Sequence, residues 1–300
     1  MNFRETSPSL IVALIPAVLV SAHVIARSGA PDTTPNPEPT RVTTSDVEWG
    51  ALNPARGKNG PRAANLWGNR TEEGTTGFLV RFSDGFSSPP HIHNVTYRGI
   101  VISGLVHNDD PAAAKMWMPP GSFWTQPAGE VHITAAKGED VLAYIEIDHG
   151  PYLVLPEGQA EDNGERPVNV DAANLVWLDH SRSTWIKPAA NPAANPDRPG
   201  GVEIAYLWGK PQPGHPSGTL VKLPAGFNGT LSSNGGALRA VIIMGAAQHR
   251  PSADAEFHVL KPGEYFGSEG RATHEISGEP DAESIIYVRT EDSFEIVPAS

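Results

Sequence analysis

The feature that most constrains the fold of this 300-residue chain is an internal repeat. The segment Leu66-Trp67-Gly68 recurs as Leu207-Trp208-Gly209, an offset of 141 residues from 67 to 208. The register continues, with one single-residue shift, as far as His132 in the first copy and His274 in the second. A repeat of this length predicts two domains of similar structure that arose by duplication.

Within each copy the sequence favours β-strands. Short apolar or alternating segments are bounded by Gly, Pro, Asn or Asp, and no long window has the spacing of an amphipathic helix. The 30 glycines and 29 prolines suit many tight turns. The predicted fold class is therefore all-β, with two tandem barrels or sandwiches. In the first copy we expect strands at 77–82, 97–106, 114–118, 141–147 and 152–155.

Composition divides the chain into four parts. Residues 1–30 contain an apolar run that follows Arg4 and precedes small residues, which is typical of a secretory signal peptide or an uncleaved anchor. Residues 31–45 are rich in Pro and Thr and predict an extended, solvated linker. The two copies are expected at 46–157 and 172–300, with a Pro-rich surface loop at 188–201. This organisation predicts a periplasmic or secreted protein.

Charge and cysteine content limit the possible partners. The formal net charge is −12 and no run of Lys or Arg is present, so we expect no nucleic-acid partner and no membrane contact beyond the signal segment. A small-molecule substrate or ligand is the expected partner. A homodimer is the expected assembly, because symmetric dimers are the commonest. Since the chain has no cysteine, any metal must be bound by His, carboxylate or Tyr.

Three histidines of the first copy form a candidate metal site. His91 and His93 are two residues apart, and positions i and i+2 of a strand project from the same face. His132 follows a Pro-x-Gly turn that leads into another strand. If that strand lies beside the first, three imidazoles converge and leave coordination positions open. The alternative is a set of hydrogen-bonded histidines without a metal.

These residues resemble the two motifs of the cupin superfamily, a family of jelly-roll-like β-barrels. The first cupin motif is matched by Gly85, His91, His93 and Gly104. The second cupin motif is matched by Gly121, Pro127, Gly129 and His132, with Ala136 where the family has Asn. The resemblance covers both copies and is greatest to an uncharacterised two-domain group related to the ChrR-like anti-sigma cupins. It implies two tandem cupin barrels.

The first copy also departs from the cupin pattern. Where the family has a glutamate ligand, this chain has Tyr97 or Arg98, so the resemblance implies a shell of three histidines, as in some cupin dioxygenases. Tyr97 is a candidate fourth ligand or proton donor, and a packing role is its alternative. Glu146 is a second weak catalytic candidate. Arg81 and Trp124 are expected to line the same cavity.

The second copy has lost most of the site. In the sequence alignment Ser232 and Asn234 stand where the first two histidines would be, and only His274 remains. One imidazole does not hold a transition metal firmly. His249 falls on no metal position, and a solvated or capping role is expected for it. The second copy is therefore predicted to be structural, regulatory or dimer-forming.

Together these observations predict an exported metal-binding protein. The leading hypothesis is a metal-dependent enzyme of the dioxygenase, hydrolase or isomerase type, acting on a small organic molecule in the first barrel. Its cofactor would be one divalent transition metal ion, Fe, Zn, Mn or Ni. The alternative is a non-catalytic metal or ligand sensor, which the kinship with anti-sigma cupins favours and the export signal opposes. A third possibility is a scaffold without chemistry.

Overall fold

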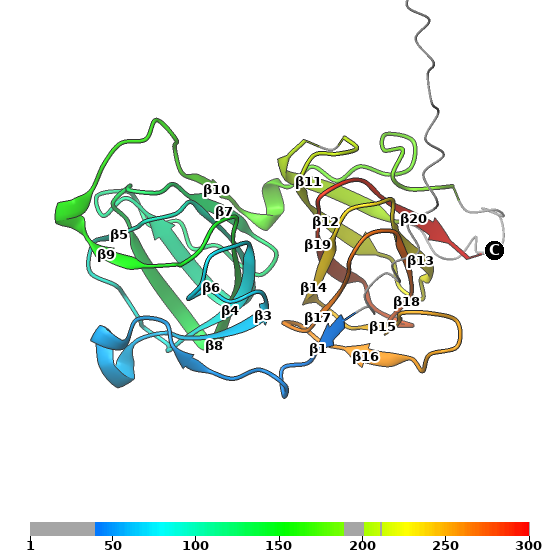
Figure 1. Ribbon diagram of the computed structural model, residues 1–300, viewed down its shortest axis with the longest axis horizontal. Helices are drawn as coiled ribbons and strands as arrows, with labels where there is room; N and C mark the ends of the chain where they lie inside the picture. Colours follow the sequence, from blue (N-terminus) through cyan, green and yellow to red (C-terminus); the bar gives the residue numbers. More distant parts are fainter. Residues whose placement is uncertain (1–39, 189–200, 211, 300) are drawn as a thin grey trace, which may run out of the picture. The chain divides into compact units, whose positions relative to one another are not determined.

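Antiparallel β-strands contain about half of the described residues and 3-10 helices contain few, so the all-β prediction with two barrels is confirmed (Figure 1). The computed structural model describes residues 40–188, 201–210 and 212–299. The predicted signal segment, and most of the predicted linker and Pro-rich loop, lie outside these ranges, so export stays a prediction of the sequence. Within the described ranges no helix has the length and apolarity needed to cross a membrane.

The first copy, coloured from blue to green in Figure 1, is built on one large and one small sheet. Its elements are β2 (Gly50–Ala51), the 3-10 helix η1 (Pro54–Asn59), β3 (Arg62–Trp67), β4 (Thr76–Phe82), β5 (His91–His93), β6 (Tyr97–Asp109), β7 (Phe123–Gln126), β8 (Ile133–Ile147), β9 (Val154–Pro156) and the 3-10 helix η2 (Glu157–Gln159). The predicted strand at 114–118 is wrong, because only Met118 makes a β-bridge, to Val106. Among the described residues the large sheet has the order β10-β7-β6-β8-β4-β3-β2, and β5 pairs with β9.

The second copy has the same plan, but two shorter strands take the place of each long strand of the first copy. Its elements are β11 (Glu203–Gly209), β12 (Ser217–Leu223), β13 (Asn228–Ser233), β14 (Leu238–Met244), β15 (Ala247–Arg250), β16 (His258–Leu260), β17 (Tyr265–Ser268), β18 (Ala272–Gly278), β19 (Ser284–Thr290) and β20 (Phe294–Pro298). In the described part of the chain they form the sheets β1-β17-β14-β19-β12-β11 and β16-β15-β18-β13-β20.

Each copy receives an edge strand from the segment that precedes the other copy. Strand β1 (Thr40–Val42) lies before the first copy, yet it pairs with β17 of the second. Strand β10 (Val168–Val170), which precedes the 3-10 helix η3 (Ala172–Asn174), pairs with β7 of the first copy. The C-terminal end of the predicted linker is therefore part of a sheet, because pairing satisfies its backbone groups. Both strands lie outside the predicted domain boundaries.

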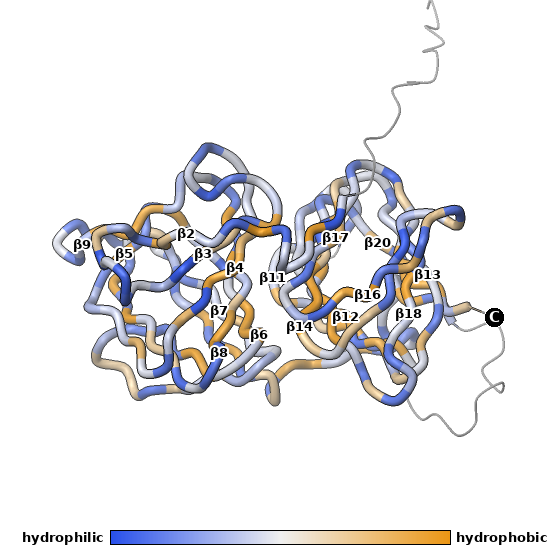
Figure 2. The backbone as a smooth tube through the Cα atoms, turned by 90° about the horizontal axis from the view of Figure 1, so that it is seen from below, coloured by the Kyte–Doolittle hydropathy of each residue, from blue (hydrophilic) through white to orange (hydrophobic). Residues whose placement is uncertain are grey.

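Alternation along the strands gives each copy its own apolar core. On β8, Ala143, Ile145 and Ile147 face the core of the first copy together with Phe78 of β4. The second copy has a core of the same kind, formed by the cluster around Ile204, Leu231, Phe266 and Ile286. Figure 2 shows apolar stretches along strands of both copies. The two cores are separate clusters.

A third apolar cluster joins the two copies. It contains Leu79 and Tyr144 of the first copy and Val241 and Tyr287 of the second. The opposite face of β8 is therefore buried as well, although by the neighbouring copy. The described residues, which begin at Thr40, belong to one compact unit.

A polar network lies within this apolar interface. The buried carboxylate of Glu146 accepts hydrogen bonds from the hydroxyls of Tyr144, at 3.1 Å, and Tyr287, at 2.7 Å. Arg289 lies 3.6 Å from the same carboxylate and donates to Asp148 at 2.8 Å. The negative charges of Glu146 and Asp148 raise the pKa of the Arg289 guanidinium against the opposing effect of its burial. A charged pair thus connects the copies where water is excluded.

The two charged residues occupy equivalent positions in the repeat. Glu146 pairs with Gly77 across β8 and β4, and Arg289 pairs with Gly218 across β19 and β12. Two copies of identical sequence would place like charges opposite each other here. One of these positions is Glu and the other is Arg. The contact therefore favours pairing of the first copy with the second over pairing of two identical copies.

Candidate metal centre

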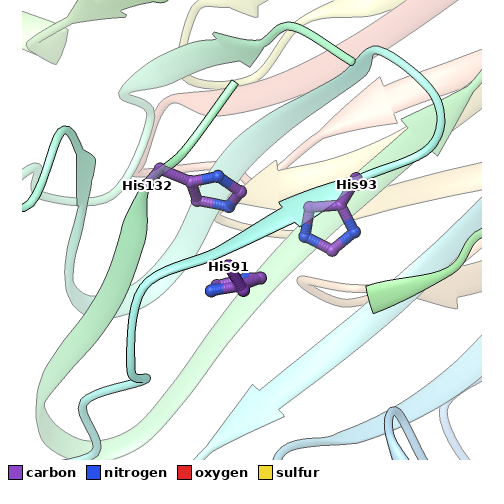
Figure 3. Close-up of side chains that lie close together, drawn as sticks. All are labelled: His91, His93 and His132. Carbon is purple, nitrogen blue, oxygen red and sulfur yellow. The ribbon is translucent and has the colours of Figure 1, made fainter. Parts of the chain in front are cut away.

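The three predicted histidines come together where β5 meets the segment leading into β8. His91 and His132 form a β-bridge, with N–H to oxygen distances between heavy atoms of 3.1 Å and 3.0 Å. His93 follows two residues after His91 on β5, so both side chains project to the same side. All three residues are buried. Figure 3 shows their rings facing a common point.

The geometry of the cluster suits a metal ion. One ligand nitrogen from each ring lies within 4.8 Å of the others. The Nδ1 atoms of His91, His93 and His132 lie 3.0, 2.8 and 3.2 Å from the backbone oxygens of residues 89, 153 and 130. Because a carbonyl oxygen only accepts, each Nδ1 must carry the proton. Each Nε2 is therefore unprotonated and carries a lone pair, and the carbonyls fix the ring orientations as hydrogen-bond partners of ligating histidines do in metal sites.

Two tyrosine hydroxyls lie beside the Nε2 atoms. The Tyr152 hydroxyl is 3.2 Å from Nε2 of His93, and the two rings stack with centroids 4.4 Å apart. The Tyr97 hydroxyl is 3.4 Å from Nε2 of His132 and donates to Oδ1 of Asn108 at 2.9 Å. Since its single proton is directed to Asn108, Tyr97 leaves the His132 lone pair unused.

Burial keeps the imidazoles neutral and the phenols protonated. Desolvation lowers the pKa of His132 to about 3. Repulsion from His91, when that ring is protonated, lowers the pKa of His132 further in the same direction. Desolvation likewise lowers the pKa of His93 well below its ordinary value and lowers that of His91. Burial raises the pKa of both Tyr97 and Tyr152. At neutral pH the site offers three neutral nitrogen donors, the form in which imidazole binds a metal.

His91 and His93 line a mostly apolar cavity. Its empty volume is about 470 Å³, which includes the open solvent at its mouth. Its apolar walls include Val80, Phe82, Phe86 and Ile145. None of the described residues that line it is Asp or Glu, and its lining contains one guanidinium, that of Arg56 on η1.

The other sequence candidates divide between the cavity and the opposite face of the sheet. Tyr97 and Trp124 line the cavity as expected. Glu146 does not, because it lies on the face of β8 that contacts the second copy. Arg81 does not either, since it is exposed and its guanidinium lies 4.4 Å from the centroid of the Trp49 ring. The expected cavity roles of Glu146 and Arg81 are therefore wrong.

Three residues of the cavity and its polar network were not among the sequence candidates. Tyr152 comes from the segment before β9, and its position two residues before that strand gave no sign of its orientation. Asn108 comes from the far end of β6, eleven residues after Tyr97, where the unbroken length of the strand was not expected. Arg56 comes from η1, which lies before the first segment in which a strand was expected.

In the second copy the structure corrects the alignment by one residue. Leu231 pairs with His274 as His91 pairs with His132, so Leu231 and Ser233 occupy the inward positions rather than Ser232 and Asn234. Leu231 and Ser233 are both buried, and Leu231 packs in the core of the second copy. Among the described residues, the cluster of the first copy is the one group of three that could hold a metal.

His249 is buried, which corrects the expectation that it is solvated. It occupies the position of Asn108, because it pairs with Ile276 as Asn108 pairs with Thr134. Its Nε2 lies 3.0 Å from Nδ1 of His274, and its ring stacks on Phe266. Desolvation lowers the pKa of His249 to about 3 and that of His274 to about 4.

We expect these two histidines to make stability fall in acid. In the unfolded chain they bind protons below about pH 6.5, whereas in the folded chain they stay neutral down to about pH 4. Their contribution to the free energy of unfolding is complete above about pH 6.5. It declines as the pH falls below this value, because the unfolded state then binds more protons than the folded state. Urea unfolding of the metal-free protein between pH 7.5 and 4.5 measures this decline.

The variant His249→Phe keeps a ring against Phe266 and removes one titrating group. It also removes Nδ1 of His249, which is buried without a hydrogen-bond partner. We therefore expect its free energy of unfolding to decline less steeply over the same pH range. An unchanged slope in the variant would show that His249 does not contribute.

The fold is shared with solved structures of low sequence identity. A candidate dioxygenase from Nostoc punctiforme has a TM-score of 0.58 at 12% identity, covering 84% of this chain and 82% of its own. The YlbA protein of E. coli, of the DUF861 family, has a TM-score of 0.54 at 13% identity, with coverages of 84% and 90%. An oxalate decarboxylase from Lactobacillus farciminis, in complex with formate, has a TM-score of 0.50 at 12% identity, with coverages of 85% and 88%.

At 12–13% identity these neighbours show a shared fold, and they give no support to the ChrR-like group. No curated protein matches the sequence. A family model described as a domain of unknown function, DUF4437, matches residues 41–297, which include both copies. The chain therefore belongs to the DUF4437 family.

Proposed function

We propose that the first copy is the active site of a metal-dependent enzyme that acts on a small organic molecule. The observation that carries this proposal is the convergence of three buried, unprotonated ring nitrogens, from His91, His93 and His132, beside an apolar cavity that His91 and His93 line. Imidazole donors suit Fe, Zn or Ni, and Mn was the fourth metal expected. Bound there, the ion would supply Lewis-acid chemistry, an activated water or a site for dioxygen.

The protein side chains around the histidines would control protons and water. The Tyr97 hydroxyl holds its proton toward Asn108, whose Nδ2 donates to Oε1 of Gln126 at 2.9 Å. Thr134 donates to the same Asn108 oxygen at 2.8 Å. This network fixes the Tyr97 oxygen beside the histidines, where it can return a proton to a bound molecule. Tyr152 offers a second hydroxyl, and the apolar walls limit the entry of water.

The names of the neighbouring structures support an enzymatic function for this chain but do not identify its reaction. Their names include a candidate dioxygenase and an oxalate decarboxylase, so the cupin barrel accommodates catalysis. The absence of a carboxylate from the described cavity lining argues against a carboxylate general base in this chain. A protein that binds a metal or a ligand without turnover is therefore the second candidate function.

Turnover by the metal-loaded protein tests the proposal. We expect oxygen uptake or product formation with at least one member of a panel of diketones, phenols and keto acids. The variant His132→Ala, shown to be folded by circular dichroism, should reduce the rate by at least about 100-fold, because loss of a ligand loosens the metal. Tight metal binding without turnover of any compound would instead support the binding protein.

A further inference from the structure

We propose that Arg56 binds the carboxylate of the substrate, and that the substrate is an organic acid whose metal-binding group is separated from this carboxylate by a short apolar spacer. This inference rests on the proposed function and names the class of molecule that the site accepts.

The first observation is that the Arg56 guanidinium has no protein partner. The side chain is half-buried and lines the cavity. No hydrogen bond or ion pair of its guanidinium is found among the residues that the structure describes, whereas Arg98 is paired with Asp148 and Arg70 donates to Asn65. Desolvation by this partial burial lowers the pKa of Arg56, a cost that an anion in the cavity would offset.

The second observation is the distribution of charge in the cavity. The three histidines are neutral, so a divalent ion bound to them would keep its full charge. Arg56 adds a positive charge to the lining of the same cavity. None of the described lining residues is acidic. In a chain with a net charge of −12, this cavity is a local positive region that selects anions.

The third observation is the chemistry of the rest of the cavity wall. Arg56 belongs to η1, between β2 and β3, whereas the histidines belong to β5 and to the residue before β8. The remaining walls are mainly apolar and include Phe82, Phe86 and Val80. A bound molecule therefore needs an anionic or chelating group at each end and an apolar middle. A guanidinium matches a carboxylate with two parallel hydrogen bonds.

Two probes separate the charge at one end from the chelating group at the other. The compound 4,6-dioxoheptanoate carries a β-diketone and a carboxylate joined by two methylenes. Heptane-2,4-dione has the same chelating group and an uncharged tail. Binding of both is measured by titration calorimetry to the Zn(II)-loaded protein at pH 7.5, and the zinc content of each sample is determined beforehand. Zinc avoids redox turnover during the measurement.

The variants isolate the contribution of Arg56. We expect the wild type to bind the acid at least about tenfold more tightly than the dione. Arg56→Met should weaken binding of the acid by about 10- to 100-fold, the range for a hydrogen bond to a charged group, and should change dione binding by less than about threefold. Arg56→Lys should restore part of the preference. Lys58→Met removes an exposed positive charge from the same η1 and should change neither affinity.

Several outcomes would overturn the assignment. Equal affinity of the wild type for acid and dione, or binding of neither compound, would exclude an acid-selective cavity. Equal weakening of both probes by Arg56→Met would make the residue structural, and an effect of Lys58→Met as large as that of Arg56→Met would indicate long-range charge alone. In each of these cases, a protein that is fully loaded with zinc still agrees with the proposed function. Failure to load zinc or another transition metal counts against the proposed function itself.

Discussion

Replacement of His93 by Gln is expected to lower the affinity of the protein for a divalent transition metal by at least about 100-fold. Loss of a residue that only hydrogen-bonds a ligand costs 10- to 100-fold in metal sites, and in the proposed site His93 is itself a ligand. Gln keeps most of the side-chain volume at this buried position, so the barrel should remain folded. Competition with a chelator of known affinity measures the change. The thermal stabilisation of the wild type by added metal should disappear in parallel.

His249→Phe is the matched control for this experiment. It changes another buried histidine, in the copy that lacks the cluster, and should leave metal affinity within about twofold. Equal metal affinity of wild type and His93→Gln would place the metal elsewhere. A loss of affinity in His249→Phe would show that the two copies are not chemically distinct.

Replacement of Glu146 by Leu is expected to reduce the free energy of unfolding by about 2–4 kcal/mol, because it leaves the buried hydroxyls of Tyr144 and Tyr287 without their acceptor. Arg289 loses one of its two counter-charges and keeps the ion pair with Asp148 at 2.8 Å. Urea unfolding at pH 7.5 measures the difference.

Two further variants show whether the effect belongs to this pair. The double variant Glu146→Leu with Arg289→Met removes both charges and should recover about half of the loss, because replacing a whole buried pair costs less than breaking it. Asp162→Asn breaks an ion pair with Arg166 whose side chains are 68% and 65% exposed, and it should cost less than about 1 kcal/mol. A cost below about 1 kcal/mol for Glu146→Leu would contradict an energetic role for the network.

The same residues show how far the sequence could predict the structure. The repeat predicted two barrels, and the spacing of His91, His93 and His132 predicted their convergence, because both depend on local alternation and on motif order. The position of Glu146 was not predictable in this way. Alternation separates Glu146 from Ile145, but both faces of β8 are buried, one by its own core and one by the second copy.

Other features depend on contacts between distant segments. The exchange of β1 and β10 between the copies involves strands of three residues each, which are too short to show a period. In the second copy a shift of one residue moved the inward positions to Leu231 and Ser233, since a one-residue slip turns every side chain to the other face. The conclusion that the second copy has lost the histidine cluster is unchanged, because neither Leu231 nor Ser233 is a histidine.

The central claim is that the first copy holds one transition metal ion through its three histidines. The most direct test is the metal-to-protein ratio, determined by elemental analysis of protein purified without a histidine tag and dialysed after loading with Fe, Zn, Mn or Ni in turn. This account predicts about one ion per chain for at least one of these metals in the wild type and none above background in His93→Gln. A wild-type protein that retains no stoichiometric metal under any of these conditions would contradict it.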